Sequence, residues 1–450
     1  MKQVVGTQAE VTDDYKEYLG SINWKITSGN SIATFINNNG TEGNVSITNS
    51  GNLSIRAIIN NNYIDKSISA TYYITDYYIT SFADLQELER VINNSTESTI
   101  ALTKNQNSLY SPIDGNGLSN AHIRLTNDIN CGQSNVHIGY LIDYSSKDDI
   151  NKFKPFRGRF DGSGFSIYNI GGSIYYHEQS NNNNKYYGYL FEVTQDAYVF
   201  NFSISGEITK TNYRNGLIGV SYNTKIKRIY TNIRTDIGYA NSANQIWEIT
   251  LGDLGTTIED ILMNDDVVAS LVSGANGFEN SSINRICSIS KVRNIGTNNS
   301  TPHGVAYLRS GTIITNCCFI GYSMSARNLS PQTNDDYIAD CYGVAANYGN
   351  NKTIRNIYAV RTGGSNGLKQ TWIIRKGSTT GNVISNCYFD YTKNAMTIQS
   401  DEGATSKSTQ QLKAGNIFLN NNNWIEKQGY YPILNNQFAI RPEMLTAIRA

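Results

Sequence analysis

The stretch FKPFRGRFDGSGFSIYNI, residues Phe153 to Ile170, decides the fold because glycines and aromatics alternate in it with β-forming residues. Glycines spaced in this way weaken a helix. Gly158, Gly162 and Gly164 instead allow sharp bends between short strands. The apolar residues expected to turn inward are Phe156, Phe160, Phe165, Ile167 and Ile170. The stretch therefore predicts a sheet that folds into a coil.

A short template repeats from Phe153 to Asp390: an aliphatic residue, any residue, Asn or Arg, and an apolar residue. Its copies recur every 27 to 40 residues, with one gap of 57, and begin at Ile167, Val199, Ile226, Ile283, Ile314, Ile354 and Ile384. Several follow a glycine-led strand by ten or eleven residues, at Gly188, Gly216, Gly304 and Gly343. A β-rich repeat of this length predicts a solenoid. Asn at a constant position predicts a ladder of side-chain hydrogen bonds along it.

The start of the solenoid, near residues 76–95, predicts a short amphipathic helix. Ser81 and Asp84 can cap its first turn. Its apolar stripe consists of Phe82, Leu85, Leu88, Val91 and Ile92. Because an exposed terminal strand invites aggregation, we expect this helix to cover the open end of the coil.

The 57-residue gap predicts a helical insertion at about residues 239–280. Both Thr257–Met263 and Asp266–Val272 have helix-like apolar spacing, with Thr257 and Asp260 as a cap. The insertion could bind a partner or form a lid over the flank of the coil.

The C-terminal part of the chain predicts a closure of the far end. Residues 408–412 can open a brief helix, and Trp424 with the segment 429–434, GYYPIL, provides bulky side chains suited to plugging the last turn. Residues 436–450 form a C-terminal arm past the repeats, and Arg441–Ala450 within it is helix-prone. Two interpretations stay open for this arm: it docks on a neighbouring subunit, or it is a frayed end.

Residues 1–75 form a separate unit of short strands with period-two alternation, such as Ile22–Ile26 and Leu53–Ala57, separated by Asn- and Gly-rich turns. This spacing predicts a small β-sandwich. The stretch WKITSGNSIATFINNNG, which starts at Trp24, together with the later LSIRAII strand, resembles bacterial immunoglobulin-like group 2 domains. Their opening strands are poorly matched here.

The remaining repeats resemble the right-handed parallel β-helix of bacterial surface proteins and phage fibre proteins, in the form with GLUG-type repeats. The resemblance is carried by the Phe-Asp-Gly-x-Gly segment at Phe160, the Ile-x-Asn-Ile and Ile-x-Asn-Cys repeats, and the Trp and Tyr-Pro-x-Leu segment near the end. It implies an N-terminal Ig-like domain at 1–75 and a β-helix at 76–435, followed by the arm.

Composition and charge narrow the class of protein. The 37 basic and 37 acidic residues balance, which argues against a nucleic-acid partner. No apolar run is long enough for membrane insertion. The N-terminus has no apolar signal region, so either the chain is not secreted by the general route or a signal was removed. Six cysteines are too sparse for a disulfide scaffold, and they and the four scattered histidines offer no metal-site spacing, so we expect no metal or cofactor.

Candidate catalytic residues are few. The adjacent carboxylates Asp148–Asp149, Asp265–Asp266 and Asp335–Asp336 would point to opposite faces on an extended chain. Asp161 is better interpreted as a turn residue that bonds its own backbone. The tyrosine pairs Tyr72–Tyr73, Tyr175–Tyr176 and Tyr186–Tyr187 could stack sugars or pave the outside of the sheets. We therefore predict no enzymatic activity and no catalytic residues.

These patterns favour a non-enzymatic structural or attachment protein. The main hypothesis is a component of a tailed-bacteriophage virion, a head or tail fibre or an adsorption protein, assembled in the host cytoplasm with reduced cysteines. Its partners would be other virion proteins and a host-surface glycan or protein, and fibre proteins are often homotrimers. The alternatives are a bacterial cell-surface adhesin and a polysaccharide depolymerase.

Overall fold

The protein is built mostly from β-strands, as the sequence predicts. The computed structural model of the 450-residue chain describes residues 22–28, 30, 33–37, 44–47, 51–59, 66–72, 75–94, 100–106, 108, 118–141, 153–171, 175–177, 185–208, 214–235, 246–268, 277–294, 305–308, 310–325, 345–347, 350–363, 374–375, 380–393, 404–439 and 441–449. Within these residues three helices accompany the strands.

Two large sheets carry the repeats, and almost all of their strands run parallel. The main path of the larger sheet contains β31 (Thr405–Lys407), β30 (Val383–Asp390), β28 (Thr353–Gly363), β26 (Ile313–Ser325), β23 (Ser282–Ser288), β20 (Thr257–Met263), β18 (Lys225–Thr235), β16 (Tyr198–Ile208), β12 (Arg159–Asp161), β8 (His122–Leu125), β6 (Tyr77–Ile79) and β7 (Thr103–Lys104). Four further strands join it: β9 (Ile129–Ser134), β13 (Ser166–Ile170), β21 (Asp266–Val268) and β24 (Lys291–Asn294).

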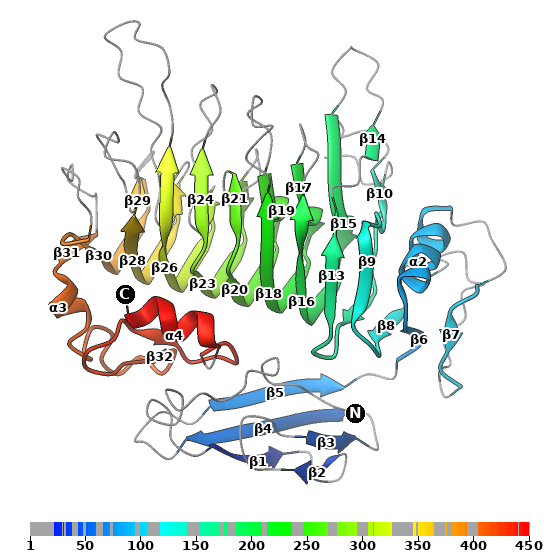
Figure 1. Cartoon of the computed structure of the whole chain (residues 1–450), viewed down its shortest axis with the longest axis horizontal. Helices are drawn as coiled ribbons and strands as arrows, with labels where there is room; N and C mark the ends of the chain where they lie inside the picture. The colour runs from blue at the N-terminus through cyan, green and yellow to red at the C-terminus, as the bar shows by residue number, and fades with distance from the viewer. Residues whose placement is uncertain are drawn as a thin grey trace, which may run out of the picture.

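The second sheet contains β14 (Tyr175–His177), β15 (Lys185–Gln195), β17 (Arg214–Tyr222), β19 (Ile246–Leu254), β22 (Gly277–Glu279), β25 (Ala306–Leu308), β27 (Ala345–Asn347) and β29 (Ile374–Arg375). The chain passes alternately between the two sheets, and each strand pairs with its counterpart one pass earlier (Figure 1). We call one such pass a rung. This order of strands fits a parallel β-helix.

The repeated template marks the inner side of the rungs. The first aliphatic residues, which we call anchors, stack in register: Val199 pairs with Ile226, Ile226 with Ile258, and Ile314 with Ile354. Most anchors are fully buried, and Ile384 packs against the same cluster. One contiguous core therefore runs through the coil, which confirms the predicted column of buried aliphatics.

The third position of the template is a bend. Asn169, Asn201, Arg228, Asp260, Arg285, Asn316, Asn356 and Asn386 all have φ between 53° and 66° there. Asn and Asp tolerate this left-handed region better than most residues, which explains their recurrence. The amides also form the predicted ladder: Asn386 Nδ2 donates to Asn356 Oδ1 at 3.1 Å, and Asn356 Nδ2 to Asn316 Oδ1 at 3.2 Å.

The predicted helical insertion at 239–280 is wrong where the structure describes it. The segment contributes β19 to β22 and supplies a rung of its own, anchored by Ile258. The residues Ile258, Ile261 and Leu262 have helical spacing, but the bend at Asp260, with φ of 57°, interrupts the alternation of the strand. Ile258 and Ile261 therefore both join the core of the coil, whereas Leu262 belongs to a separate apolar cluster. Residues 269–272 of the second expected helix lie outside the described residues.

The capping helix is confirmed as α2 (Phe82–Asn94). Ser81 N donates to Asp84 Oδ2 at 3.0 Å, and Asp84 N to Ser81 Oγ at 3.3 Å. Leu85, Leu88, Val91 and Ile92 are buried in the same core cluster as the first rungs, and Phe82 packs against it. α2 lies at the end of the coil next to β6 and β9 (Figure 1).

The N-terminal strands lie where the alternation predicts them. β1 (Ile22–Ser28), β4 (Gly51–Ile59) and β5 (Lys66–Tyr72) form an antiparallel sheet, and β2 (Ala33–Asn37) pairs with β3 (Asn44–Ile47). Two short antiparallel pairs complete the strands: β10 (Tyr140–Leu141) with β11 (Phe153–Lys154), and β32 (Trp424–Ile425) with β33 (Ile433–Leu434).

The C-terminal segment folds back along the outside of the coil, so the expectation that it plugs the last rung is wrong. Trp424 and Tyr431 pack on Tyr358 of β28, and α4 (Pro442–Arg449) lies against β26. Residues 441–449 therefore dock on their own chain. The physical reason is an apolar row on the outer face of neighbouring strands, which requires cover: Tyr230, Leu262, Cys287, Cys318 and Tyr358.

Two of these residues change the expectation for the cysteines. Cys287 and Cys318 oppose each other on β23 and β26 and form a disulfide, with Cα atoms 4.7 Å apart. Cys131, Cys317 and Cys387 are buried thiols outside the disulfide, as the apolar patterns around them predict. Cys341 lies outside the described residues.

Candidate functional site at the end of the coil

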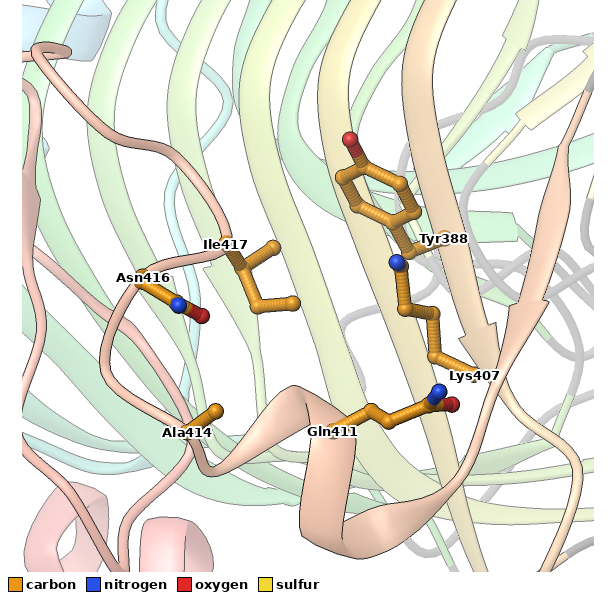
Figure 2. Close-up of a pocket in the computed structure, with 6 residues that line it drawn as sticks. All are labelled: Tyr388, Lys407, Gln411, Ala414, Asn416 and Ile417. Carbon is orange, nitrogen blue, oxygen red and sulfur yellow. The ribbon is translucent and has the colours of Figure 1, made fainter.

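A pocket of about 480 Å³ lies where the last rung meets the returning C-terminal segment. Figure 2 shows its walls: Tyr388 from β30 and Lys407 from β31 face the segment that carries Ala414, Asn416 and Ile417. Gln411 closes the space from α3 (Thr409–Leu412). We call this space the terminal pocket.

The short helix α3 is placed by its own cap. Gln411 N donates to Ser408 Oγ at 3.1 Å, and Ser408 N donates to Gln411 Oε1 at 2.8 Å. This capping box confirms the brief helix expected at 408–412 and leaves the Gln411 amide nitrogen available at the pocket wall.

A buried carboxylate ties α3 to the last rung. Asp390 accepts hydrogen bonds from Thr409 Oγ1 at 2.6 Å and from the Tyr431 hydroxyl at 2.5 Å. Burial by itself would raise the pKa of Asp390, but the hydrogen bonds from Thr392, Thr409 and Tyr431 outweigh it and leave the pKa below its ordinary value. These hydrogen bonds hold α3, which forms one wall of the pocket, against the last rung.

Tyr388 and Lys407 set the chemistry of the pocket. Lys407 Nζ lies 5.2 Å from the centroid of the Tyr388 ring, a cation–π distance. Burial raises the pKa of Tyr388, and the neighbouring Cys387 and Glu426 raise it further, so its hydroxyl stays protonated at neutral pH. Together with the amides of Gln411 and Asn416, these groups offer an aromatic face, hydrogen-bond donors and one positive charge to a polar ring-shaped ligand.

The carboxylates considered from the sequence do not assemble here. Asp265 is buried and accepts from Thr231 Oγ1 and Ile233 N, both at 2.7 Å, whereas Asp266 is half-buried near Lys291. Asp161 accepts from Ser163 N at 2.8 Å, which confirms its predicted role in a turn. The pairs Asp148–Asp149 and Asp335–Asp336 lie outside the described residues.

Tyrosine pairing is visible only in the backbone. β14 and β15 bring Tyr175 opposite Tyr187 and Tyr176 opposite Tyr186.

Among the described residues, no group of three His, Cys, Asp or Glu side chains could hold a metal ion. No described helix is long and apolar enough to cross a membrane.

Sequence reasoning did not find the terminal pocket. Its six residues come from β30, β31, α3 and the loop that follows. Gln411 belongs to the capping box of α3, which predicts a helix but no pocket. The aromatic cluster of Trp424 and Tyr431 likewise indicates a packed segment but gives no information about where that segment lies.

Comparison with known proteins adds no family. No protein-family model matches the chain, and no curated protein matches it significantly.

Proposed function

We propose that this chain is a non-enzymatic attachment protein, in which a right-handed parallel β-helix acts as a rigid spacer and presents its flank and end to a surface. In this proposal residues 1–75 form an Ig-like module. The observation that carries the proposal is the single buried core that runs from α2 to β30. A stack of this kind resists bending because each rung packs on the next.

The terminal pocket supports binding over hydrolysis. Glycoside hydrolysis uses two carboxyl groups on either side of the bond that breaks. The six residues that line the pocket carry none. Their aromatic ring, amides and ammonium group are instead suited to holding a sugar.

We place the protein first in the virion of a tailed bacteriophage, where it would bind other virion proteins and a host-surface glycan or protein. The supporting observation is the resemblance of the repeats to phage fibre proteins. Immunogold electron microscopy with an antibody against the chain tests this assignment. We expect label on purified particles, and label on neither particles nor cells would refute attachment as the function.

A bacterial cell-surface adhesin is the second candidate, and one observation favours it. The disulfide between Cys287 and Cys318 is a bond that persists in oxidising compartments and is rare in the cytosol. Peptide mapping of the native protein without reductant tests whether Cys287 and Cys318 are linked. A linked peptide together with gold label on cells would select the adhesin over the virion protein.

A polysaccharide depolymerase is the remaining alternative. Incubation of the purified full-length chain with host capsule tests it directly. Release of oligosaccharides would overturn the non-enzymatic assignment, whereas retention of the chain on intact capsule is the outcome we expect.

A further inference from the structure

A second pocket, of about 550 Å³, lies between α2 and the pair β10 and β11, at the opposite end of the coil from the terminal pocket (Figure 1). Small-molecule sites commonly have volumes of about 300–1,000 Å³. Five of the lining residues come from α2, and Tyr140 and Lys154 come from the two strands. Every lining side chain carries a polar group. We call this space the helix pocket.

One face of α2 supplies most of the wall of the helix pocket. Gln86, Glu89 and Asn93 are three and four residues apart, so they lie on the same side of the helix. The apolar stripe that packs on the coil occupies other positions, Leu85, Leu88, Val91 and Ile92. Covering the first rungs therefore does not account for this polar face.

Hydrogen bonds hold α2 and the strands together around the helix pocket. Asn93 Nδ2 donates to His137 O at 2.8 Å, and Lys154 Nζ donates to Asn93 O at 2.8 Å. Tyr140 and Lys154 pair directly across β10 and β11. The pocket is therefore preformed, which reduces the entropy lost when a ligand binds.

Glu89 is the unusual group in the helix pocket. Its side chain is half-buried, and burial raises the pKa of its carboxyl group. The His137 amide donates a hydrogen bond to this carboxyl, but no ion pair joins Glu89 to any described residue. The nearby Glu87, in contrast, pairs with Arg90 at 2.7 Å.

The position of Glu89 suggests a binding role. A carboxylate that is partly withdrawn from water and has no cation beside it costs stability. The cost is explained if the carboxylate serves a ligand in the cavity that it lines. Lys154 on the opposite wall can serve the same ligand, because an ammonium group has three donors and its bond to Asn93 uses one.

We propose that the helix pocket binds a neutral sugar, whose hydroxyl groups donate hydrogen bonds to Glu89 and accept them from Gln86 and Lys154. This inference rests on the proposed attachment function and adds a second glycan site, so that the chain carries one at each end of its coil. A hydroxyl group both donates and accepts, which matches a pocket that combines a carboxylate, amides and an ammonium group. A charged ligand of either sign fits less well, because it would lie near a like charge.

Binding of the full-length chain to immobilised neutral glycans tests the proposal. The probes are dextran, mannan and galactan, with polygalacturonate as the anionic glycan and chitosan as the cationic one. We expect binding to at least one neutral glycan, and an affinity that varies little with salt because the hydroxyl groups carry no charge to be screened.

The decisive variant is Glu89→Gln. Its amide keeps one oxygen for the His137 amide but replaces the second carboxylate oxygen by a donor. Affinity should fall at least about tenfold, because hydrogen bonds to a charged acceptor are lost. Glu207→Gln is the matched control, since Glu207 is exposed on β16 and lines neither pocket. It should leave affinity unchanged, and circular dichroism should report intact folds for both variants.

Gln411→Ala in the terminal pocket separates the two sites. A loss of affinity confined to Gln411→Ala would assign glycan binding to the terminal pocket and overturn the proposal. Absence of binding to every neutral glycan, tighter binding to either charged glycan, or equal affinities of Glu89→Gln and Glu207→Gln would also overturn it. In each of these cases the attachment function stands if the unaltered chain still attaches to host cells, and fails if it does not.

Discussion

Arg285 donates two hydrogen bonds to Asp260 of the preceding rung, from Nε to Oδ1 at 2.7 Å and from Nη2 to Oδ2 at 2.9 Å. Both residues occupy the left-handed bend of the repeated template. Burial alone would raise the pKa of Asp260, but Arg285, together with the charges of Lys227 and Arg228, outweighs it and the pKa of Asp260 is lower than usual. This ion pair continues the line of side-chain contacts that the Asn ladder forms in later rungs.

Arg285→Ala should lower the free energy of unfolding at neutral pH by roughly 3 kcal/mol, because it leaves a nearly buried carboxylate without its main partner. The lowered pKa of Asp260 means that this stabilisation is present above the carboxyl's ordinary pKa and is lost in acid, so the two proteins should converge as pH falls. Urea unfolding at several pH values measures both effects.

The control for the ion pair is Lys291→Ala. Lys291 lies 3.8 Å from Asp266 with its side chain 60% exposed, so its removal should cost at most about 0.5 kcal/mol. Equal losses for the two variants would mean that the Arg285 contact is an ordinary surface pair.

Ile258→Ala tests the rung that the sequence did not predict. Ile258 is fully buried in register between Ile226 and Ile283, so we expect a loss of about 2–5 kcal/mol in chemical denaturation. Ile313→Ala, at an outward position that is 45% exposed, should change stability by less than about 1 kcal/mol. A small loss of stability for Ile258→Ala would mean that the segment at 239–280 is an insertion outside the core.

Gly311→Ala tests the tight turn between the two sheets. Gly311 has φ of 72°, and an added Cβ would lie 2.1 Å from Asn280 Oδ1. Gly255→Ala, at an equivalent turn with φ of 67°, would meet no atom closer than 4.0 Å. We expect a loss of about 1 kcal/mol from backbone strain at Gly255 and a larger loss at Gly311. Equal losses of stability for the two variants in thermal unfolding would show that the contact with Asn280 relaxes without cost.

Glu192→Gln should change the pH dependence of stability. Glu192 is buried on β15, none of the described residues donates a hydrogen bond to its carboxyl oxygens, and burial raises its pKa to about 8. The folded chain therefore keeps a proton that the unfolded chain releases above about pH 4.3, so stability falls as pH rises between these two values. The glutamine variant should lack this contribution to the decrease of stability with pH.

Urea midpoints from about pH 5 to about pH 8 measure the change. Asp265, whose pKa burial raises to about 7, leaves a residual slope of the same sign. Glu207→Gln on the exposed side of β16 should preserve the full slope. A glutamine variant with the slope of the unaltered chain would mean that Glu192 is ionised in the folded protein.

Much of the coil was predictable because its signals are local. The anchors Ile283, Ile314, Ile354 and Ile384 recur every 30 to 40 residues. The apolar stripe of α2 follows helical periodicity after its Ser81 cap. The rung at Ile258 was missed because Thr257–Met263 satisfies helical and extended spacing at once, and Asp260 was not recognised as a bend residue. Asp260 was the available signal, since Asp tolerates the left-handed backbone much as Asn does.

The sequence by itself determined the repeat, its buried column and the helix that covers its first rungs, because each depends on neighbours along the chain or on one repeated spacing. Only the tertiary structure decided that Trp424 lies on Tyr358, that Arg285 meets Asp260, and where the terminal pocket is. These contacts join residues from different rungs. Their positions depend on the path by which the chain returns along the coil, which no local pattern encodes.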